Sequence, residues 1–129
     1  MTERPKPTAA ELEILDILWE MHRATVGDIH KTISERRPTA YTTVLKQMQI
    51  MHEKGLVQRD EKDKAHVYRP AQSQRQTQSR LVTDLLNKAF RGSALKLVQH
   101  VLETKPASPE ELAEIRKLIA DAETKGAKK

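Results

Sequence analysis

The sequence contains no cysteine, and this absence excludes disulfide bonds, thiolate metal sites and cysteine nucleophiles together. Aromatic residues are also scarce, at 3%, and hydrophobic residues make up only 37% of the 129 residues. A monomer of this composition would have a thin core, because small chains bury a smaller fraction of their surface. We therefore expect part of the apolar surface to be buried between subunits.

Long hydrophobic runs are missing as well. No apolar stretch approaches the roughly 18 residues of a membrane-spanning helix, and residues 1–8 lack the apolar segment of a secretion signal. We expect a soluble cytoplasmic protein with no membrane insertion. Its length suits one compact domain, or a small domain plus a dimerisation segment.

Side chains that carry catalysis or bind metal do not form recognisable motifs. The five histidines are His22, His30, His52, His66 and His100. They share no metal-ligand spacing, and no serine lies in a nucleophile elbow or beside a paired base. The sequence therefore predicts no enzyme, no metal site and no cofactor.

The charge that is present is unevenly distributed. The net charge is +5, and Arg36, Arg37 and Lys46 lie in a segment, residues 36–50, without any acidic residue. The acidic residues of the first predicted helix are Glu11, Glu13, Asp16 and Glu20. Such segregation is typical of a protein that contacts DNA with one side.

Two helices are predicted before residue 38. Thr8 and Glu11 have the spacing of a capping box, and the apolar residues that follow recur at helical spacing. Thr25 is the expected cap of a second, shorter helix that ends before Pro38.

The third predicted helix is capped by Thr39 and ends at Lys54. Val44, Met48 and Met51 form its inner face. The outward residues are Tyr41, Thr42, Thr43, Lys46, Gln47, Gln49 and Ile50. Their hydroxyls, amides and cation suit base edges and phosphates, although a solvated polar face would have the same pattern.

Two short strands follow the third helix. They are expected at residues 56–60 and 65–69, flanking a charged turn at 61–64, with Pro70 ending the second. Three helices followed by a hairpin is the order of a winged helix-turn-helix domain. The fold class is therefore mainly α with a small β-hairpin.

Apolar stripes at helical spacing continue after the hairpin. They predict a fourth helix up to Gly92, a fifth that Pro106 ends, and a sixth that Ser108 caps. The residues expected to bury this surface in a dimer are Leu81, Leu85, Phe90, Leu95, Val98, Leu102, Leu112, Ile115 and Ile119. The same stripes would also suit a monomeric extension of the core.

The expected division of the chain follows from these elements. Residues 1–70 form the winged-helix DNA-binding domain, residues 71–123 the helical dimerisation region, and residues 124–129 a flexible Lys-rich tail.

Four segments of the sequence resemble the penicillinase-repressor family, which includes beta-lactamase, methicillin-resistance and copper-transport repressors. They are Leu12–Trp19 in the first helix, Thr39–Val44 at the start of the third, Lys54–Val57 entering the hairpin and Ala65–Pro70 leaving it. The resemblance extends from about residue 8 to residue 119.

The resemblance implies a homodimeric repressor that binds a palindromic operator, with its third helices in successive major grooves and its C-terminal helices interlocked. Dimers of this kind read half-sites about one helical turn apart. The residues expected to contact DNA from the third helix are Thr39, Tyr41, Thr42, Thr43, Lys46 and Gln47. The residues expected to hold phosphates from the hairpin are Arg59, Lys62, Lys64 and Arg69.

The sequence departs from the family where regulation is concerned. Beta-lactam-responsive members are cleaved at an Asn–Phe bond after a membrane-anchored sensor signals, but the matching stretch here is Val98, Gln99, His100 and Val101. Copper-responsive members carry C-terminal cysteines, which this sequence lacks. A membrane sensor or protease is therefore a partner by resemblance only, and the inducer, operator and target genes are not predicted.

Two other functions fit the same pattern. A winged helix can serve as a protein-interaction module, and a basic protein without a specific site can coat DNA as a nucleoid protein. Tyr41 could also pack on the hairpin instead of facing DNA. Salt-dependent and sequence-dependent binding to DNA would separate these alternatives.

Overall fold

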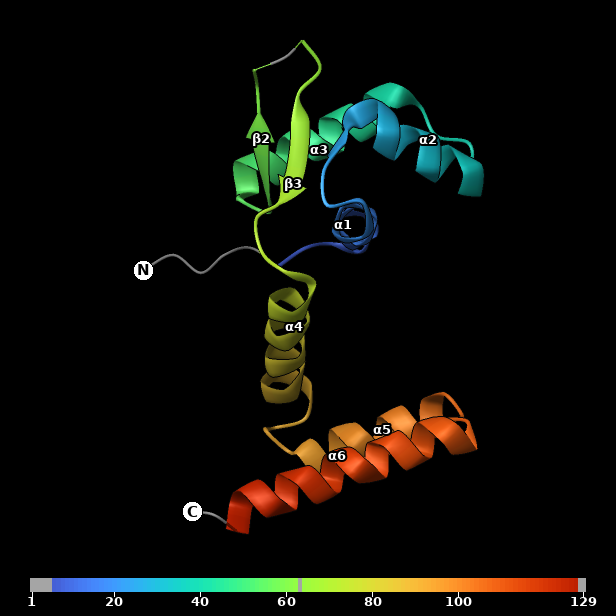
Figure 1. Ribbon diagram of the computed structural model, residues 1–129, viewed down its shortest axis with the longest axis vertical. Coiled ribbons are helices and arrows are strands. Elements are labelled where there is room, and N and C mark those ends of the chain that lie inside the picture. The colour runs from blue at the N-terminus through green and yellow to red at the C-terminus, as the bar shows by residue number, and fades with distance from the viewer. Residues whose placement is uncertain (1–5, 63, 128–129) are drawn as a thin grey trace. The chain divides into compact units, whose positions relative to one another are not determined.

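The computed structural model describes residues 6–62 and 64–127 (Figure 1). Its elements are α1 (Ala9–Met21), β1 (Ala24–Thr25), α2 (Val26–Arg36), α3 (Tyr41–Lys54), β2 (Val57–Asp60), β3 (Val67–Pro70), α4 (Gln74–Ala89), α5 (Ala94–Thr104) and α6 (Pro109–Ala127). The predicted class, mainly α with a small sheet, is confirmed. The chain divides into two compact units, Met1–Val82 and Thr83–Lys129, and the division falls within α4. A functional boundary at residue 70 stays a prediction.

Capping boxes start α1 and α2, at the two cap residues that the sequence predicts, Thr8 and Thr25. The Thr8 hydroxyl accepts from the Glu11 amide at 3.2 Å, and the Glu11 carboxylate accepts from the Thr8 amide at 2.9 Å. Thr25 and Asp28 repeat this exchange at 3.1 and 3.0 Å. Each box satisfies amides that have no partner inside the helix, and this determines where the helix begins.

The start of α3 differs from the prediction. Ala40 occupies the N-cap and makes no side-chain hydrogen bond there. The Thr39 hydroxyl instead donates to the Arg37 carbonyl at 3.0 Å. The predicted Thr39 cap is wrong, because the helix begins one residue later and the hydroxyl closes the preceding turn. At the other end, Gly55 adopts φ 81°, the left-handed conformation that the predicted stop requires.

The three strands form one antiparallel sheet in the order β1-β3-β2. β2 and β3 are the predicted hairpin, with pairing limited to residues 57–60 and 67–70. β1 was not predicted; Ala24 lies opposite Tyr68 and Thr25 opposite Val67. We call β2, β3 and the turn between them the wing.

A single core joins α1, α2 and α3 to the sheet. Its buried residues are Ile14, Leu15, Ile17, Leu18, Ala24, Val26, Ile29, Ile33, Val44, Met48, Met51, Val57 and Tyr68. All of them lie between residues 14 and 68. Beyond Thr77, no residue that the structure describes is buried. The hydrophobic core therefore belongs to the winged helix alone.

Serine caps define the C-terminal helices. The Ser93 hydroxyl accepts from the Lys96 amide at 3.2 Å, and the Ser108 hydroxyl accepts from the Glu111 amide at 3.1 Å, which confirms the predicted Ser108 cap. α6 continues to Ala127, through the point where we expected a flexible tail to begin; residues 128–129 of that tail lie outside the described residues. None of the described helices combines the length and apolar character needed to cross a membrane.

Candidate nucleic-acid interface

The turn between α2 and α3 is held by His30. Its Nε2 lies 2.7 Å from the Thr39 carbonyl oxygen and 3.1 Å from the Ser34 hydroxyl. The imidazole also meets the Tyr41 ring edge-on, with centroids 5.7 Å apart. One side chain of α2 thus contacts both the turn and the first residue of α3, and this defines the position at which α3 begins.

The first turns of α3 present polar side chains to solvent. Thr42, Thr43 and Lys46 are exposed, and Tyr41 is 48% exposed. Val44, on the opposite side, is buried with the rest of the predicted inner face. The start of α3 therefore has the amphipathic character that the sequence predicts.

Gln47 is placed differently from the other α3 candidates. It is half-buried, and its Nε2 lies 3.4 Å from Glu11 Oε2 on α1. The structure therefore differs from the outward position predicted for Gln47, because the α3 face that carries it turns toward α1. A contact between Gln47 and DNA stays a prediction.

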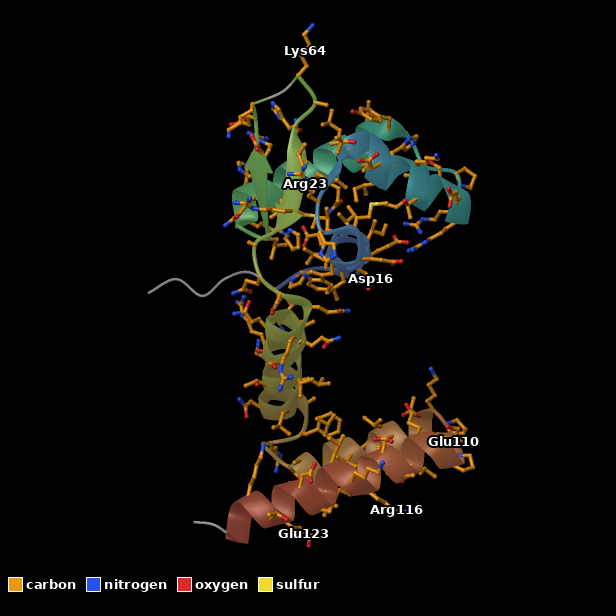
Figure 2. The ribbon with its side chains drawn as sticks, in the orientation of Figure 1. Asp16, Arg23, Lys64, Glu110, Arg116 and Glu123 are labelled. Carbon is orange, nitrogen blue, oxygen red and sulfur yellow. The ribbon has the colours of Figure 1, made fainter. Side chains whose placement is uncertain are left out.

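A groove of about 420 Å³ lies between α2, the start of α3 and the wing. The α3 residues in it are Tyr41, Leu45 and Gln49, and the wing residues are Arg59, Lys64, Ala65, His66 and Tyr68. Lys64 is exposed at the tip of the hairpin (Figure 2). Two of the predicted wing cations thus share a groove with the polar start of α3.

The remaining wing cations surround a second hollow, of about 360 Å³. Lys62 and Arg69 line it together with Arg59. Arg69 Nε donates to the Gln58 side-chain oxygen at 2.8 Å, and Arg59 pairs with Glu61 at 2.8 Å. These contacts hold both arginines along the wing. Asp60 and Glu61 also line this hollow, so carboxylates offset part of its positive charge.

Arg23 lines the same hollow, and sequence reasoning missed it. The residue directly precedes β1, and Ala24 of β1 pairs with Tyr68 of β3. This pairing brings Arg23 to the wing (Figure 2). A strand of two residues leaves no periodic signal in a sequence, so only the pairing with β3 could have identified this cation.

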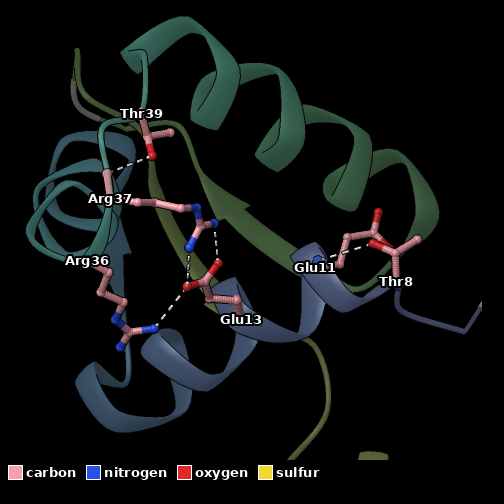
Figure 3. A network of polar contacts seen from close by, with 6 residues as sticks. All are labelled: Thr8, Glu11, Glu13, Arg36, Arg37 and Thr39. Carbon is pink, nitrogen blue, oxygen red and sulfur yellow. Dashed lines mark hydrogen bonds and ion pairs between the residues drawn. The ribbon is translucent and has the colours of Figure 1, made fainter.

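Two arginines of the basic segment, Arg36 and Arg37, donate hydrogen bonds to Glu13 of α1, as Figure 3 shows. Glu13 accepts from Arg37 at 2.6 and 3.0 Å and from Arg36 at 3.1 Å. The charges that are segregated along the sequence are therefore paired in space. The expectation that Arg36 and Arg37 add to a one-sided positive surface is corrected, because Glu13 neutralises part of their charge.

This cluster predicts a pH dependence. The hydrogen bond from Arg37 is the main cause that lowers the pKa of Glu13 from 4.5 to about 2, and Arg36 adds to it. A carboxyl whose pKa is lowered by folding stabilises the fold above pH 4.5 and loses that contribution as the pH falls toward 2. Both arginine side chains are about half exposed, so we expect an effect of about 1 kcal/mol.

Urea unfolding of the wild type and of Glu13→Gln between pH 7 and pH 2 tests this. The wild type should be more stable at pH 7, and the difference should disappear as the pH approaches 2. Glu20→Gln, a change at an exposed position of the same helix, should show no such difference. A difference between wild type and Glu13→Gln that stays constant with pH would contradict the assignment.

A buried carboxylate links α1 to the C-terminal end of α3. Glu11 is 1% exposed and accepts from Lys54 Nζ at 2.8 and 3.1 Å, in addition to the Thr8 amide. Burial raises the pKa of Glu11, but the hydrogen bonds from Lys54 and Thr8 and the charge of Lys54 outweigh it, and the pKa is lowered. Glu11 is therefore ionised at neutral pH and fixes one end of α3 against α1.

The C-terminal unit and the end of α4 carry most of the exposed apolar side chains. Of the predicted dimerisation residues, Leu85, Leu95, Val98, Leu102 and Ile119 are exposed, and Leu81, Phe90, Leu112 and Ile115 are half-buried. Val82, Val101 and Leu118 are also exposed, at 50%, 56% and 67%. Exposed apolar side chains in such number are typical of surfaces that contact another protein.

Metal ligands do not come together within the described ranges. No group of three or more His, Asp or Glu side chains there could hold an ion. His30 is engaged at the α2–α3 turn, and His100 packs edge-on against Phe90 with centroids 5.4 Å apart.

Known proteins resemble this chain over most of its length. A family model described as penicillinase repressor matches residues 7–121. A "Transcriptional regulator BlaI" of Mycobacterium tuberculosis (strain CDC 1551 / Oshkosh) is 32% identical over 115 residues, which cover 88% of this chain and 82% of that protein. A "Methicillin resistance regulatory protein MecI" of Mammaliicoccus sciuri is 22% identical over 112 residues, 87% of this chain and 91% of that protein.

Proposed function

The chain belongs to the penicillinase repressor family of transcriptional repressors, which are not enzymes, and we propose that it binds a palindromic DNA operator as a homodimer. The observation that carries this proposal is the groove in which the polar start of α3 and the wing cations Arg59 and Lys64 lie together. A dimer bound over a promoter would exclude RNA polymerase and so repress transcription.

We propose that α3 reads the sequence of the operator. A recognition helix enters the major groove with its N-terminal residues toward the base edges. Thr42, Thr43 and Lys46 have the exposure that this requires, and Tyr41 lines the adjoining groove. Thr39 and Gln47, which are half-buried, would contact DNA only at the margin of this face or after a change of rotamer.

The wing supplies affinity through phosphates. Arg59, Lys62, Lys64 and Arg69 are the predicted contacts, and we add Arg23 because it lines the same hollow as Arg69. Phosphate contacts orient a protein on DNA and make binding salt-dependent, but they carry no base sequence directly. Recognition and affinity thus come from different elements of the same unit.

The partner in the dimer covers the apolar surface of the C-terminal helices. This proposal is supported by the lack of any buried residue beyond Thr77 in the described chain. A palindromic operator has two-fold symmetry, and a symmetric dimer presents one recognition helix to each half-site.

Salt dependence tests the DNA-binding proposal. The logarithm of the association constant for duplex DNA should fall linearly with the logarithm of the salt concentration, with a slope of about −0.9 per phosphate contacted. A protein-interaction module would bind no DNA even at low salt. A nucleoid protein would show the slope but bind its own upstream region and random DNA equally.

Lys46→Ala is expected to lower operator affinity about 30-fold, because each protomer loses a contact to a base edge or phosphate in the major groove. Equilibrium titration of a labelled operator duplex measures this. Lys105→Ala removes the same charge from the connection between α5 and α6 and should leave affinity unchanged. Equal affinities of Lys46→Ala and wild type would remove Lys46 from the interface.

A further inference from the structure

The start of α3 lacks the side-chain cap that begins α1 and α2. Thr8 and Thr25 cap those helices with their hydroxyls, but Ala40 has no polar side chain to offer the first amides of α3. The Ala40 carbonyl accepts from the Thr43 amide at 3.1 Å and from the Val44 amide at 3.4 Å, and these bonds close the first turn. Contacts from outside α3 must therefore fix the position of this turn.

His30 supplies such a contact from α2. A carbonyl oxygen can only accept, so His30 Nε2, which lies 2.7 Å from the Thr39 oxygen, carries a proton and donates. Ser34 follows one turn further along α2, and its hydroxyl is 3.1 Å from the same nitrogen. The half-buried imidazole also meets the ring of Tyr41, the first residue of α3. One side chain thus contacts the residue before the Ala40 cap and the residue after it.

A shift of this turn would affect the two kinds of DNA contact differently. Hydrogen bonds weaken steeply with distance and misalignment, and the exposed first-turn residues Thr42 and Thr43 have short side chains that cannot follow a displaced base edge. The wing cations have long side chains on other elements, and contacts to phosphates carry no base sequence directly. A displaced first turn should therefore reduce discrimination between DNA sequences without reducing the affinity for DNA in general.

We propose that His30 is a positioning residue for sequence recognition, which holds the Thr39 carbonyl and so determines where the first turn of α3 meets the base edges. The inference rests on the proposed function, because only a helix that reads DNA has base edges to meet. His30 itself touches no DNA and acts only through α3. All the contacts that carry the proposal lie within the N-terminal compact unit.

The test measures the affinity of the full-length protein for two duplexes of equal length, the operator that the wild type protects and a random sequence. His30→Phe keeps an aromatic ring beside Tyr41 and loses the donor. Its preference for the operator over the random duplex should fall about tenfold, while its affinity for the random duplex and the salt dependence of that affinity stay unchanged. His30→Gln, whose amide can donate to the same carbonyl, should recover most of the preference.

His52→Phe is the matched control, because it makes the same change at a half-buried histidine near the other end of α3. It should keep the full preference. An unchanged preference in His30→Phe would overturn the proposal, and so would an equal loss in His52→Phe or in His30→Gln. An equal loss in His30→Gln would show that the missing donor is not the cause.

Amide hydrogen exchange separates this proposal from the proposed function, because it needs no DNA. In His30→Phe, exchange at Thr43 and Val44 should accelerate by a larger factor than exchange at the buried residues Met48 and Met51 of the same helix. Wild-type rates, or an equal acceleration at all four amides, would overturn the positioning role whatever the DNA result. If the first turn alone accelerates but the wild type binds no DNA, the proposed function fails and the inference about sequence recognition fails with it.

Discussion

Replacing Leu85 with aspartate is expected to convert the dimer into monomers and to lower operator affinity about 1000-fold, because a monomer retains only one half-site contact. Leu85 is 47% exposed in the single chain and lies on the apolar stripe of α4. Burying an unpaired carboxylate in the proposed interface would cost several kcal/mol. Sedimentation velocity gives the assembly state, and titration of the operator duplex gives the affinity.

Asn87→Asp is the matched control for this prediction. It places the same charge two residues further along α4, at an exposed polar position. It should leave both the sedimentation coefficient and the affinity near the wild-type values. A Leu85→Asp protein that still sediments as a dimer would show that α4 does not form the interface.

Lys54→Met is expected to lower the free energy of unfolding at pH 7 by about 3 kcal/mol, because it leaves the ionised Glu11 carboxylate buried without a cation. Glu11 is 1% exposed, so water cannot replace Lys54 without a rearrangement of α1 and α3. Chemical denaturation measures the loss. The exposed Lys88→Met change, which removes only a surface pair with Asp84, should cost less than about 1 kcal/mol.

The double variant Lys54→Met, Glu11→Gln tests whether the loss of stability comes from the unpaired charge of Glu11. Removing the unpaired charge should recover about half of the stability that Lys54→Met loses. Burial without Lys54 would also raise the pKa of Glu11 in the folded state, so Lys54→Met should lose stability as the pH rises through 4.5. Additive losses in the double variant, or a loss independent of pH, would contradict the role of this ion pair.

Local signals in the sequence predicted the helices of the winged domain well. A capping box depends on residues three positions apart, so Thr8 with Glu11 and Thr25 with Asp28 could be recognised without any tertiary information. Gly55 marked the end of α3 for the same reason. Thr39 was misjudged, because its hydroxyl had a competing acceptor in the Arg37 carbonyl two residues back.

Features that depend on contacts between distant residues were not predictable in this way. β1 has two residues and exists only by pairing with β3, so the position of Arg23 at the wing was missed. The ion pair between Arg37 and Glu13 joins residues 24 positions apart, so the sequence did not show that part of the positive charge of the basic segment is neutralised. The turn of Gln47 toward Glu11 likewise depends on how α1 packs against α3.

The C-terminal helices illustrate a different limit. Helical spacing predicted their existence and their apolar stripes, but it cannot distinguish a stripe that completes a core from one that awaits a partner. The exposure of Leu95 at 78% and Leu118 at 67% in the single chain favours the second reading. The exposure of these apolar side chains therefore supports the proposed dimer, whereas their helical spacing alone does not.

A gel shift on the intergenic DNA upstream of the protein's own gene, with excess random DNA as competitor and followed by footprinting, tests whether a dimer recognises a specific operator. We expect a shift that survives the competitor and a footprint with two related half-sites, one for each protomer. A shift that random DNA abolishes, or no shift at low salt, would contradict that expectation.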